Sequence, residues 1–365
     1  MTVQSRTASA PSKVNLTLHV GPADESGYHA LVSTFEALSL RDYVTVRRVD
    51  DRWSDKDSRQ DTRRVRSFIY DVPANGDRPG ISKEHTEEFA TLDPEQHLAL
   101  RACRALGLGD RVELTVHKTI PVAGGMAGGS ADAAAALVAA NDLFELGHSF
   151  EDLQRIGATL GADVPACLVG GIALGIGRGD QMTPLRAGTE FPDADSHWWA
   201  LALAEDGLST PQVFHAFDDL AVRRSQARLS GDLPGNLSGA VPSGHFCENA
   251  LALQDSASFS MPVPAAVLSG LLTNDLMPAA LAMRPELADV GRAMMETRPG
   301  EPSALGWVVS GSGPTVAGLA SSREEAQAIA TRVLSQPGVR GVAVGWGPGV
   351  GARVESALPD WVVEG

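Results

Sequence analysis

The sequence predicts an α+β protein built from two domains. The chain has 365 residues, which is more than one ordinary hydrophobic core accommodates. Its residues are 43% hydrophobic and 21% charged, a composition that excludes fibrous and wholly disordered proteins. Segments with strand-like alternation also interleave with segments of helical periodicity, and this order is typical of two-layer α+β domains.

The N-terminal elements are expected to be strands. Apolar side chains alternate over residues 13–20, which predicts a half-buried strand with Lys13 and Asn15 together on its polar face. Residues 42–49 form a second strand candidate. Two strands so close in sequence indicate that the first domain begins with a sheet.

A charged stretch then separates these strands from the next ordered elements. Residues 50–93 are rich in Asp, Arg, Ser, Glu and Lys, and only the short apolar patch at 67–72 interrupts them. We expect most of this stretch to be a solvated insertion. Apolar residues recur at helical spacing over 98–106, and residues 111–116 alternate as a strand.

A change of composition marks the expected domain boundary. Residues 183–198 turn to Pro, Gly, Asp and Thr, which predicts domains at 1–184 and 185–365. A second polar stretch, residues 218–244, is expected to be a mobile connection or long loop. The remaining elements are expected to alternate: a helix over 285–297, a strand over 306–310, a helix over 323–334 and a strand over 341–346.

Charge and cysteine content exclude several classes of function. Thirty Lys and Arg against 45 Asp and Glu give a net charge of −15, which repels nucleic acid and anionic membranes. Cys103, Cys167 and Cys247 are widely separated, so neither a disulfide framework nor a zinc site is indicated. The N-terminus lacks the apolar core of a signal peptide, and we expect a cytoplasmic protein with no membrane or nucleic-acid partner.

The densest glycine run in the chain lies in residues 120–137. Four glycines directly precede Ser130 and an alanine-rich helix. Glycines let backbone N–H groups face an anion, and the start of a helix adds free donors and partial positive charge. We therefore expect a phosphate site in which Ser130 caps the helix or contacts phosphate or Mg²⁺, and in which Asp132 favours the first turn or helps to hold a cation. The alternative is a turn that serves packing alone, and the run is not a Walker loop.

Three further features have both a structural and a chemical interpretation. Asp163 precedes a Pro-containing turn, where it is either a turn residue or a general base. Lys13 is either a solvent-facing strand lysine or the group that keeps Asp163 ionised and stabilises transition-state charge. The Gly/Ser turn at 309–316 is either a simple connection or a loop that folds over a ligand. The glycines at 175–180 resemble half of a dinucleotide motif, but no helical pattern follows them.

Three segments, around Lys13, in the glycine run at 120–137 and at the Gly/Ser turn at 309–316, together resemble the motifs of the GHMP small-molecule kinases. These segments are APSKVNL near the start, PVAGGMAGGSADAAAAL in the middle and VVSGSGPTVAGL toward the end. The neighbouring segments at 27–31, 161–165, 175–180 and 209–214 resemble the members that phosphorylate 4-diphosphocytidyl-2-C-methyl-D-erythritol. The resemblance covers residues 10–214 and 248–354, and it implies an N-terminal ribosomal-protein-S5-like domain and a C-terminal ferredoxin-like α/β sandwich.

The resemblance also implies a role for each motif residue. Lys13 and Asp163 would be the catalytic pair, and Ser130 would be the Mg²⁺ contact. The ATP-binding set would be Pro121, Ala123, Gly124, Gly125, Met126, Ala127, Gly128, Gly129, Ser130 and His97. The substrate-binding set would be Asn15, Tyr28, His29, Pro211, Phe214, Gly311, Ser312 and Gly313, in which aromatic rings suit a nucleobase.

The implied activity is ATP- and Mg²⁺-dependent phosphorylation of the 2-hydroxyl of this cytidine-diphosphate substrate, in the methylerythritol phosphate pathway to isoprenoid precursors, by a monomer or homodimer. The alternatives are a homoserine- or mevalonate-type member and a non-catalytic nucleotide-binding relative. Two positions depart from the family. His97 occupies the place of an Asn that faces adenine, and Ala127 replaces a common glycine, so we expect a negative φ at Ala127.

Overall fold

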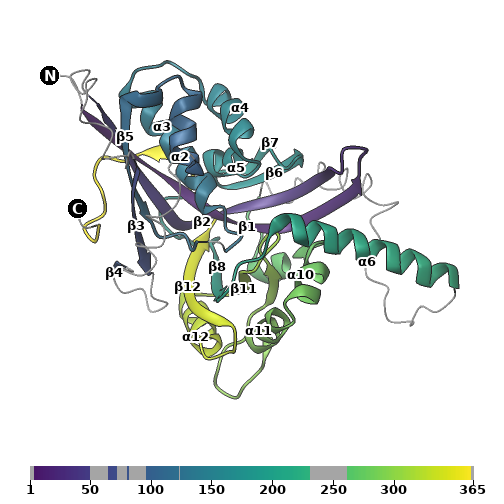
Figure 1. Cartoon of the computed structure of the whole chain (residues 1–365). Helices are drawn as coiled ribbons and strands as arrows, with labels where there is room; N and C mark the ends of the chain where they lie inside the picture. The colour runs from purple at the N-terminus through teal and green to yellow at the C-terminus, as the bar shows by residue number, and fades with distance from the viewer. Residues whose placement is uncertain are drawn as a thin grey trace.

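The computed structural model places two β-sheets and their covering helices side by side (Figure 1). It describes residues 4–49, 65–71, 80–81, 96–122, 124–230 and 261–362. Within these residues helices and strands are mixed as an α+β protein requires, and the prediction of fold class is confirmed. No helix of this described part is both long and apolar enough to cross a membrane.

The first sheet is built on a long antiparallel hairpin. Its main path is β13-β1-β2-β5-β3-β4, and β9 joins at β1 while β6 and β7 extend from β2. The strands are β1 (Ser5–Ala23), β2 (His29–Arg48), β3 (Val65–Asp71), β4 (Gly80–Ile81), β5 (Val112–Lys118), β6 (Ile172–Gly177), β7 (Gln181–Arg186), β9 (Thr273–Asn274) and β13 (Arg353–Val354).

Strand β1 differs from the expected half-buried strand. It begins eight residues before Lys13 and continues to Ala23, and β2 likewise begins well before residue 42. Both faces of β1 are buried, since Lys13 and Asn15 on the expected polar face are only 4% and 3% exposed. The alternation was read correctly, but the side that we assigned to solvent meets Asp163, Gly311 and Asp275 from other parts of the chain.

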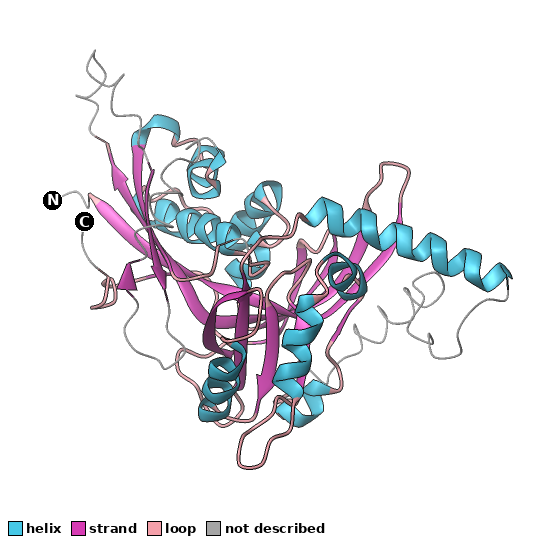
Figure 2. Cartoon of the chain, turned by 60° about the horizontal axis from the view of Figure 1, so that its bottom comes forward, coloured by secondary structure: helices cyan, strands magenta, loops and turns pink. Residues whose placement is uncertain are grey.

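Helices α2 (Leu98–Ala105), α3 (Gly128–Leu143), α4 (Phe150–Leu160) and α5 (Val164–Val169) cover one face of this sheet (Figures 1 and 2). Helix α3 lies innermost, and its alanines 131 and 133–136 are all fully buried. A helix with such small side chains can approach both the sheet and its neighbouring helices closely. The start of α3 is thereby held firmly at the sheet.

The second sheet has the order β10-β11-β8-β12, and every pair in it is antiparallel. Its strands are β8 (His197–Ala204), β10 (Gly306–Val309), β11 (Val316–Ala320) and β12 (Val339–Gly347), with α11 (Glu286–Met295) and α12 (Arg323–Val333) packed against them. The first and fourth strands in sequence are neighbours, and the third pairs with the first, as in a ferredoxin-like sandwich. The distal strands and helices expected from the sequence are confirmed.

The two sheets are joined through a buried carboxylate on β2. Glu36 is fully buried, and its two oxygens contact His197 Nδ1 at 2.5 Å and Trp199 Nε1 at 2.9 Å. His197 and Trp199 both belong to β8 of the second sheet. A hydrogen-bonded carboxylate with no solvent exposure holds its partners in one geometry, so the sheets have a fixed relation at this point.

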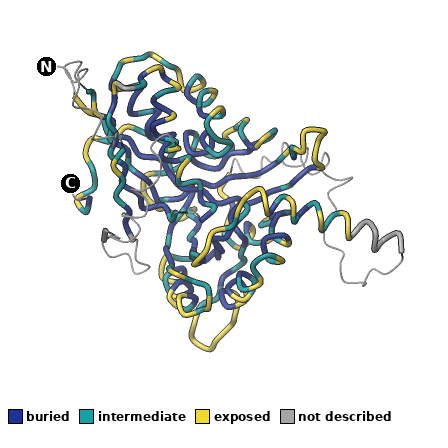
Figure 3. The backbone as a smooth tube through the Cα atoms, in the orientation of Figure 1, coloured by how far each residue is buried: buried dark blue, intermediate teal, exposed yellow. Residues whose placement is uncertain are grey.

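Other expectations fare differently. The polar stretch at 218–244 is not all loop, because α6 (Thr210–Ser230) continues through about its first half and projects from the body (Figures 1 and 3). Residues 231–244 lie outside the described residues, as does most of the expected insertion at 50–93, although residues 67–71 of its apolar patch lie within β3. Short helices α9 (Ala265–Ser269) and α10 (Met277–Met283) precede α11. The boundary at 184/185 stays a prediction.

Candidate active site

The glycine run forms the connection between β5 and α3. Asp42 of β2 fixes the start of this loop, because its Oδ1 accepts hydrogen bonds from Thr119 N at 2.7 Å and Ile120 N at 2.8 Å. The loop therefore leaves the sheet at a defined place. Ala123 lies outside the described residues.

A buried charge cluster lies beneath the loop. Lys118 Nζ is 2.6 Å from a carboxylate oxygen of Asp42 and 2.6 Å from one of Asp132, and all three side chains are at most 2% exposed. Burial raises the pKa of Asp42 to about 7, against the lowering effect of the Lys118 charge. Asp132 is thus held by Lys118 and lies beyond the first turn of α3, whereas a role in holding a cation stays a prediction.

The start of α3 differs from the expectation in two respects. The helix begins at Gly128, so Ala127 is its N-cap and Ser130 is its third residue rather than the cap. Ala127 has φ of 63°, in the left-handed region, and the expected negative φ is wrong. The chain must turn sharply here to aim the first helical N–H groups outward, and this need overrides the steric preference of alanine.

The surface of this helix start is open. Gly129 is exposed and Ser130 is half-buried, so the free N–H groups of the first turn are accessible. The accessible donors and the partial positive charge suit a polyphosphate, even in a chain with a net charge of −15.

The glycine loop packs directly on the Gly/Ser loop that follows β10. A Cβ on Gly125 would lie 2.6 Å from the carbonyl oxygen of Gly313, and a Cβ on Gly124 would lie 2.8 Å from Thr315 Oγ1. Ser310 Oγ also donates to the carbonyl of Gly125 at 3.3 Å. Only glycines permit this approach, so two motifs that are far apart in sequence form one surface.

Lys13 of β1 lies at the edge of that surface. Its Nζ donates to Asn15 Oδ1 at 2.7 Å and lies 3.7 Å from Asp163 Oδ2. The Lys13 side chain is 6% exposed, whereas that of Asp163 is 36% exposed. A Cβ on Gly311 would lie 3.2 Å from the same Nζ. The ammonium group therefore meets a carboxylate that stays open to solvent, beside the Gly/Ser loop.

Asp163 is the residue before α5, and its side chain makes no capping hydrogen bond to that helix. The carboxylate is consequently not used to cap the start of α5. Its turn also approaches the start of α3, since a Cβ on Gly161 would lie 3.7 Å from Ser130 Oγ. The Lys13–Asp163 pair and the start of α3 after the glycine loop are therefore neighbours.

Three predicted substrate residues, Tyr28, His29 and Phe214, lie near the tip of the β1–β2 hairpin, where His29 pairs with Ala23, whereas Lys13 pairs with Ala37. The rings of His29 and Phe214 lie 5.1 Å apart, and His29 Nδ1 is 2.8 Å from the carbonyl oxygen of Gly21. Tyr28 lies beneath the guanidinium of Arg178, 4.6 Å from its ring centre. His29 is only 5% exposed and packs on Phe214 and Phe217, so the half-buried rings of Tyr28 and Phe214 are the ones that a nucleobase could reach.

Helix α6 brings the last predicted substrate residues to the Gly/Ser loop. The hydroxyls of Thr210 and Ser312 are 2.8 Å apart, which places the exposed Pro211 next to that loop. Pro211 and Phe214 belong to the first turns of the same helix. Helix α6 therefore connects the His29 side of the predicted substrate set with the Gly/Ser loop.

His97 has a capping role at α2. Its Nδ1 accepts from Ala99 N at 3.4 Å, and the neighbouring Leu98 lies 3.4 Å from where a Cβ on Gly129 would stand. Burial, together with the Lys118 charge, lowers the pKa of His97 to about 4. A neutral imidazole therefore lies next to the first turn of α3, and contact of His97 with adenine stays a prediction.

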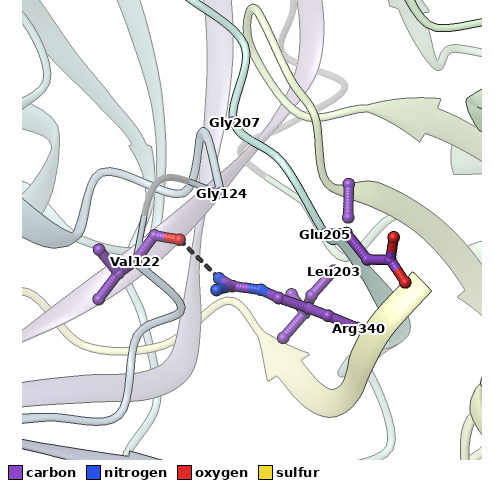
Figure 4. A pocket seen from close by; sticks show the side chains of 7 residues that line it. Val122, Gly124, Leu203, Glu205, Gly207 and Arg340 are labelled. Atoms are coloured by element: carbon purple, nitrogen blue, oxygen red, sulfur yellow. Dashed lines mark hydrogen bonds between the residues drawn. The ribbon is translucent and has the colours of Figure 1, made fainter. Parts of the chain in front are cut away.

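Several residues of this region were missed. Lys118 and Asp42 carry no motif signal beyond their charge, and their meeting depends on strand register. Arg340 of β12 donates to the carbonyl of Val122 at 2.7 Å and so ties the loop to the second sheet (Figure 4). Asn274 of β9 binds the Gly/Ser loop from the other side. Each is found only once distant strands are placed together.

Comparisons with known proteins agree with this geometry. The family model described as GHMP kinases N terminal domain matches residues 96–171, and that described as GHMP kinases C terminal matches residues 266–339. A crystal structure of 4-(cytidine 5'-diphospho)-2C-methyl-D-erythritol kinase is similar with a TM-score of 0.56 and 25% identity, over 94% of this chain and 98% of that one. An L. major mevalonate kinase shares the fold with a TM-score of 0.59 but only 13% identity, over 95% and 98% of the two chains.

Sequence relatives are closer. The 4-diphosphocytidyl-2-C-methyl-D-erythritol kinase of Mycolicibacterium smegmatis is 38% identical over 98% of this chain and 94% of the relative. The protein of the same name from Thermobifida fusca is 40% identical over 96% of this chain and 98% of the relative. The chain therefore belongs to the 4-diphosphocytidyl-2-C-methyl-D-erythritol kinase family of the GHMP kinases.

Proposed function

We propose that the chain transfers the γ-phosphate of ATP to 4-diphosphocytidyl-2-C-methyl-D-erythritol, the acceptor in the name of its relatives. It is a small-molecule kinase of the GHMP type and acts in isoprenoid precursor biosynthesis. The observation that carries the residue assignment is the meeting of three motifs: Lys13 Nζ lies 3.7 Å from Asp163 Oδ2 and beside the Gly311 backbone, which itself packs on the glycine loop.

In the proposed reaction the 2-hydroxyl oxygen of the acceptor attacks the γ-phosphorus. A new O–P bond forms, the bond between the γ-phosphorus and the β,γ-bridging oxygen breaks, and ADP leaves with the bonding electrons. Asp163 orients the hydroxyl and takes its proton, while Lys13 keeps Asp163 ionised and offsets negative charge at the transferred group. Positioning and charge neutralisation are the main needs of such a transfer.

The ATP side is assigned to the loop and the start of α3. The N–H groups of Gly128, Gly129 and Ser130 would bind the triphosphate. Among the described residues no three His, Cys, Asp or Glu side chains converge to hold a metal alone. A Mg²⁺ ion that arrives with ATP would have Ser130 Oγ as a candidate hard oxygen ligand, and it would neutralise phosphate charge.

The cytidine side is assigned to Tyr28, His29 and Phe214, with Asn15 and the loop at 311–313 nearer the reacting end. Aromatic faces suit a nucleobase better than they suit homoserine or mevalonate. A cytoplasmic location and a monomeric or homodimeric state stay predictions from the sequence.

The test is ADP release by the purified chain with ATP and Mg²⁺, with the cytidylyl acceptor run beside homoserine, mevalonate and no acceptor. Release with the cytidylyl acceptor alone, inhibited by CDP, is expected. Release with another alcohol would refute the cytidine site, and ATP binding without any release would favour a non-catalytic relative.

A further inference from the structure

Asn274 links the strand that carries Lys13 to the Gly/Ser loop. It belongs to β9, which pairs in parallel with β1 through Thr17 and Leu18. The amide of Asp275 continues this pairing by donating to the carbonyl of Leu18 at 2.9 Å. Asn274 is thus held against the strand from which Lys13 and Asn15 project, although no feature of the local sequence singles it out.

The Asn274 carboxamide is buried and fully engaged as a donor. The residue is 7% exposed, and its Nδ2 donates to the carbonyl oxygens of Val309 and Gly311, each at 2.7 Å. Its Oδ1 accepts from Leu276 N at 2.9 Å. Both amide protons therefore bind backbone carbonyls on the two sides of Ser310, at the point where β10 ends and the loop begins.

The loop position fixed in this way controls the surroundings of Lys13. Gly311 has φ of 59°, and a Cβ there would lie 3.2 Å from Lys13 Nζ and 3.4 Å from Asn15 Oδ1. The backbone at 311 is consequently confined between Lys13 and Asn15 on one side and Asn274 on the other. Any shift of the loop changes the space that the acceptor hydroxyl must enter.

We propose that Asn274 is a positioning residue for phosphoryl transfer: it holds the 309–313 backbone at the distance from Lys13 that aligns the acceptor. This inference rests on the proposed function and deepens it. Asn274 does not touch the reacting atoms, so its contribution is to the geometry of the acceptor side. Misplacement of a reactant by about 1 Å is enough to lower turnover by about 100-fold.

The variant Asn274→Asp tests this with almost no change of shape. It replaces both donors by an acceptor that faces two carbonyl oxygens, so the loop loses its attachment. The matched control is Asp275→Asn, in the same segment, which keeps an acceptor for the Val20 N–H that Asp275 binds at 3.0 Å. Neither substitution removes a proposed catalytic or binding group.

For Asn274→Asp we expect kcat/KM for the cytidylyl acceptor to fall by about tenfold or more, while the Kd of ATP changes less than about threefold. Asp275→Asn should keep kcat/KM within about twofold of the parent. An unchanged kcat/KM in Asn274→Asp, or an equal loss in both variants, would overturn the positioning role.

Hydrogen exchange separates this inference from the proposed function. The amides of Ser310 and Gly313 donate within the loop to Thr315 O and Ser310 O, each at 2.9 Å. Both amides should exchange faster in Asn274→Asp than in the parent and in Asp275→Asn. Unchanged exchange in Asn274→Asp would refute the anchoring role of Asn274, whichever acceptor the parent protein uses. Faster exchange in Asn274→Asp, combined with a parent protein that does not phosphorylate the cytidylyl acceptor, would refute only the proposed function.

Discussion

Two lysines in this chain meet carboxylates in opposite ways. Lys118 lies between Asp42 and Asp132, 2.6 Å from each, in a cluster at most 2% exposed. Lys13 lies 3.7 Å from Asp163, whose side chain is 36% exposed. The first arrangement is closed, because each charge has a direct partner and no solvent. The second is open, so Asp163 can take a substrate hydroxyl as a partner without leaving Lys13.

Residue type alone therefore does not separate a structural lysine from a catalytic one. Both lysines are buried, and both belong to strands of the first sheet. The closed cluster holds the ends of the glycine loop, while the open pair faces the place where three motifs meet. Distance and access to solvent distinguish the two roles, and each can be tested separately.

The largest effect is expected for Asp163→Asn. The amide keeps the size of the side chain but cannot accept the acceptor proton, so kcat should fall by about 10²- to 10⁴-fold. Because Asp163 makes no capping bond with its side chain and its pair with Lys13 is open to solvent on the carboxylate side, the free energy of unfolding should change by about 1 kcal/mol or less. ADP release and denaturant unfolding measure the two quantities, and parental turnover would remove Asp163 from the mechanism.

Lys118→Met should act on stability in the first place. It leaves two carboxylates buried without their shared cation, and breaking a buried ion pair costs about 3–5 kcal/mol. The matched variant Lys13→Met should lose clearly less unfolding free energy, since water can reach Asp163. Equal losses in urea unfolding of the two variants would contradict the distinction between the closed cluster and the open pair.

A third test uses pH, through His97 next to the closed cluster. Its pKa of about 4 in the folded protein lies below the ordinary value of 6.5, because of burial first and then the Lys118 charge. Between pH 6.5 and 4 the unfolded chain therefore binds a proton that the folded chain refuses, so stability falls as the pH drops. At about 1.4 kcal/mol per unit, the loss reaches about 3 kcal/mol.

The variant His97→Asn keeps a capping acceptor without a titrating ring, so its stability should fall less steeply over this range. Burial also lowers the pKa of His117 to about 4, so part of the acid sensitivity should remain. Identical acid dependence of unfolding in parent and variant would show that His97 titrates normally.

The smallest effect concerns the backbone at the glycine loop. Ala127 has φ of 63°, so Ala127→Gly relieves steric strain but loosens the unfolded chain. The two terms leave a net gain of up to about 1 kcal/mol in unfolding free energy. Glu145→Gly, at φ of 52° and away from the site, is the control. If Ala127→Gly lowers the unfolding free energy while Glu145→Gly raises it, the alanine side chain at 127 stabilises the glycine loop despite its positive φ.

The sequence predicted the parts of the site better than their arrangement. Glycine runs and an acid before a Pro turn have local causes, so the glycine loop, Asp163 and the Gly/Ser loop were located from the order of residues. The convergence of Lys13 with Gly311 depends on packing between two sheets. Asn274 gave no signal because a buried carboxamide matters only for the carbonyls that it meets.

The fold shows the same division. Distal helices and strands followed from periodicity, whereas the burial of both faces of β1 did not, since alternation reports a difference between faces and not what covers them. The prediction of a negative φ at Ala127 was wrong, because the direction in which the chain must enter α3 overrides the steric preference of alanine. Helix α6 continues past residue 218 through a charged sequence that composition alone assigned to a loop.

The most direct test of the account is the position of the transferred phosphate, observed by phosphorus NMR after the chain has acted on ATP, Mg²⁺ and 4-diphosphocytidyl-2-C-methyl-D-erythritol. Carbon 2 of the acceptor carries a methyl group and no hydrogen, so a phosphomonoester on its oxygen has no three-bond proton coupling. The account predicts one new uncoupled phosphomonoester signal, formed together with ADP. A proton-coupled phosphomonoester, or inorganic phosphate in its place, would contradict it.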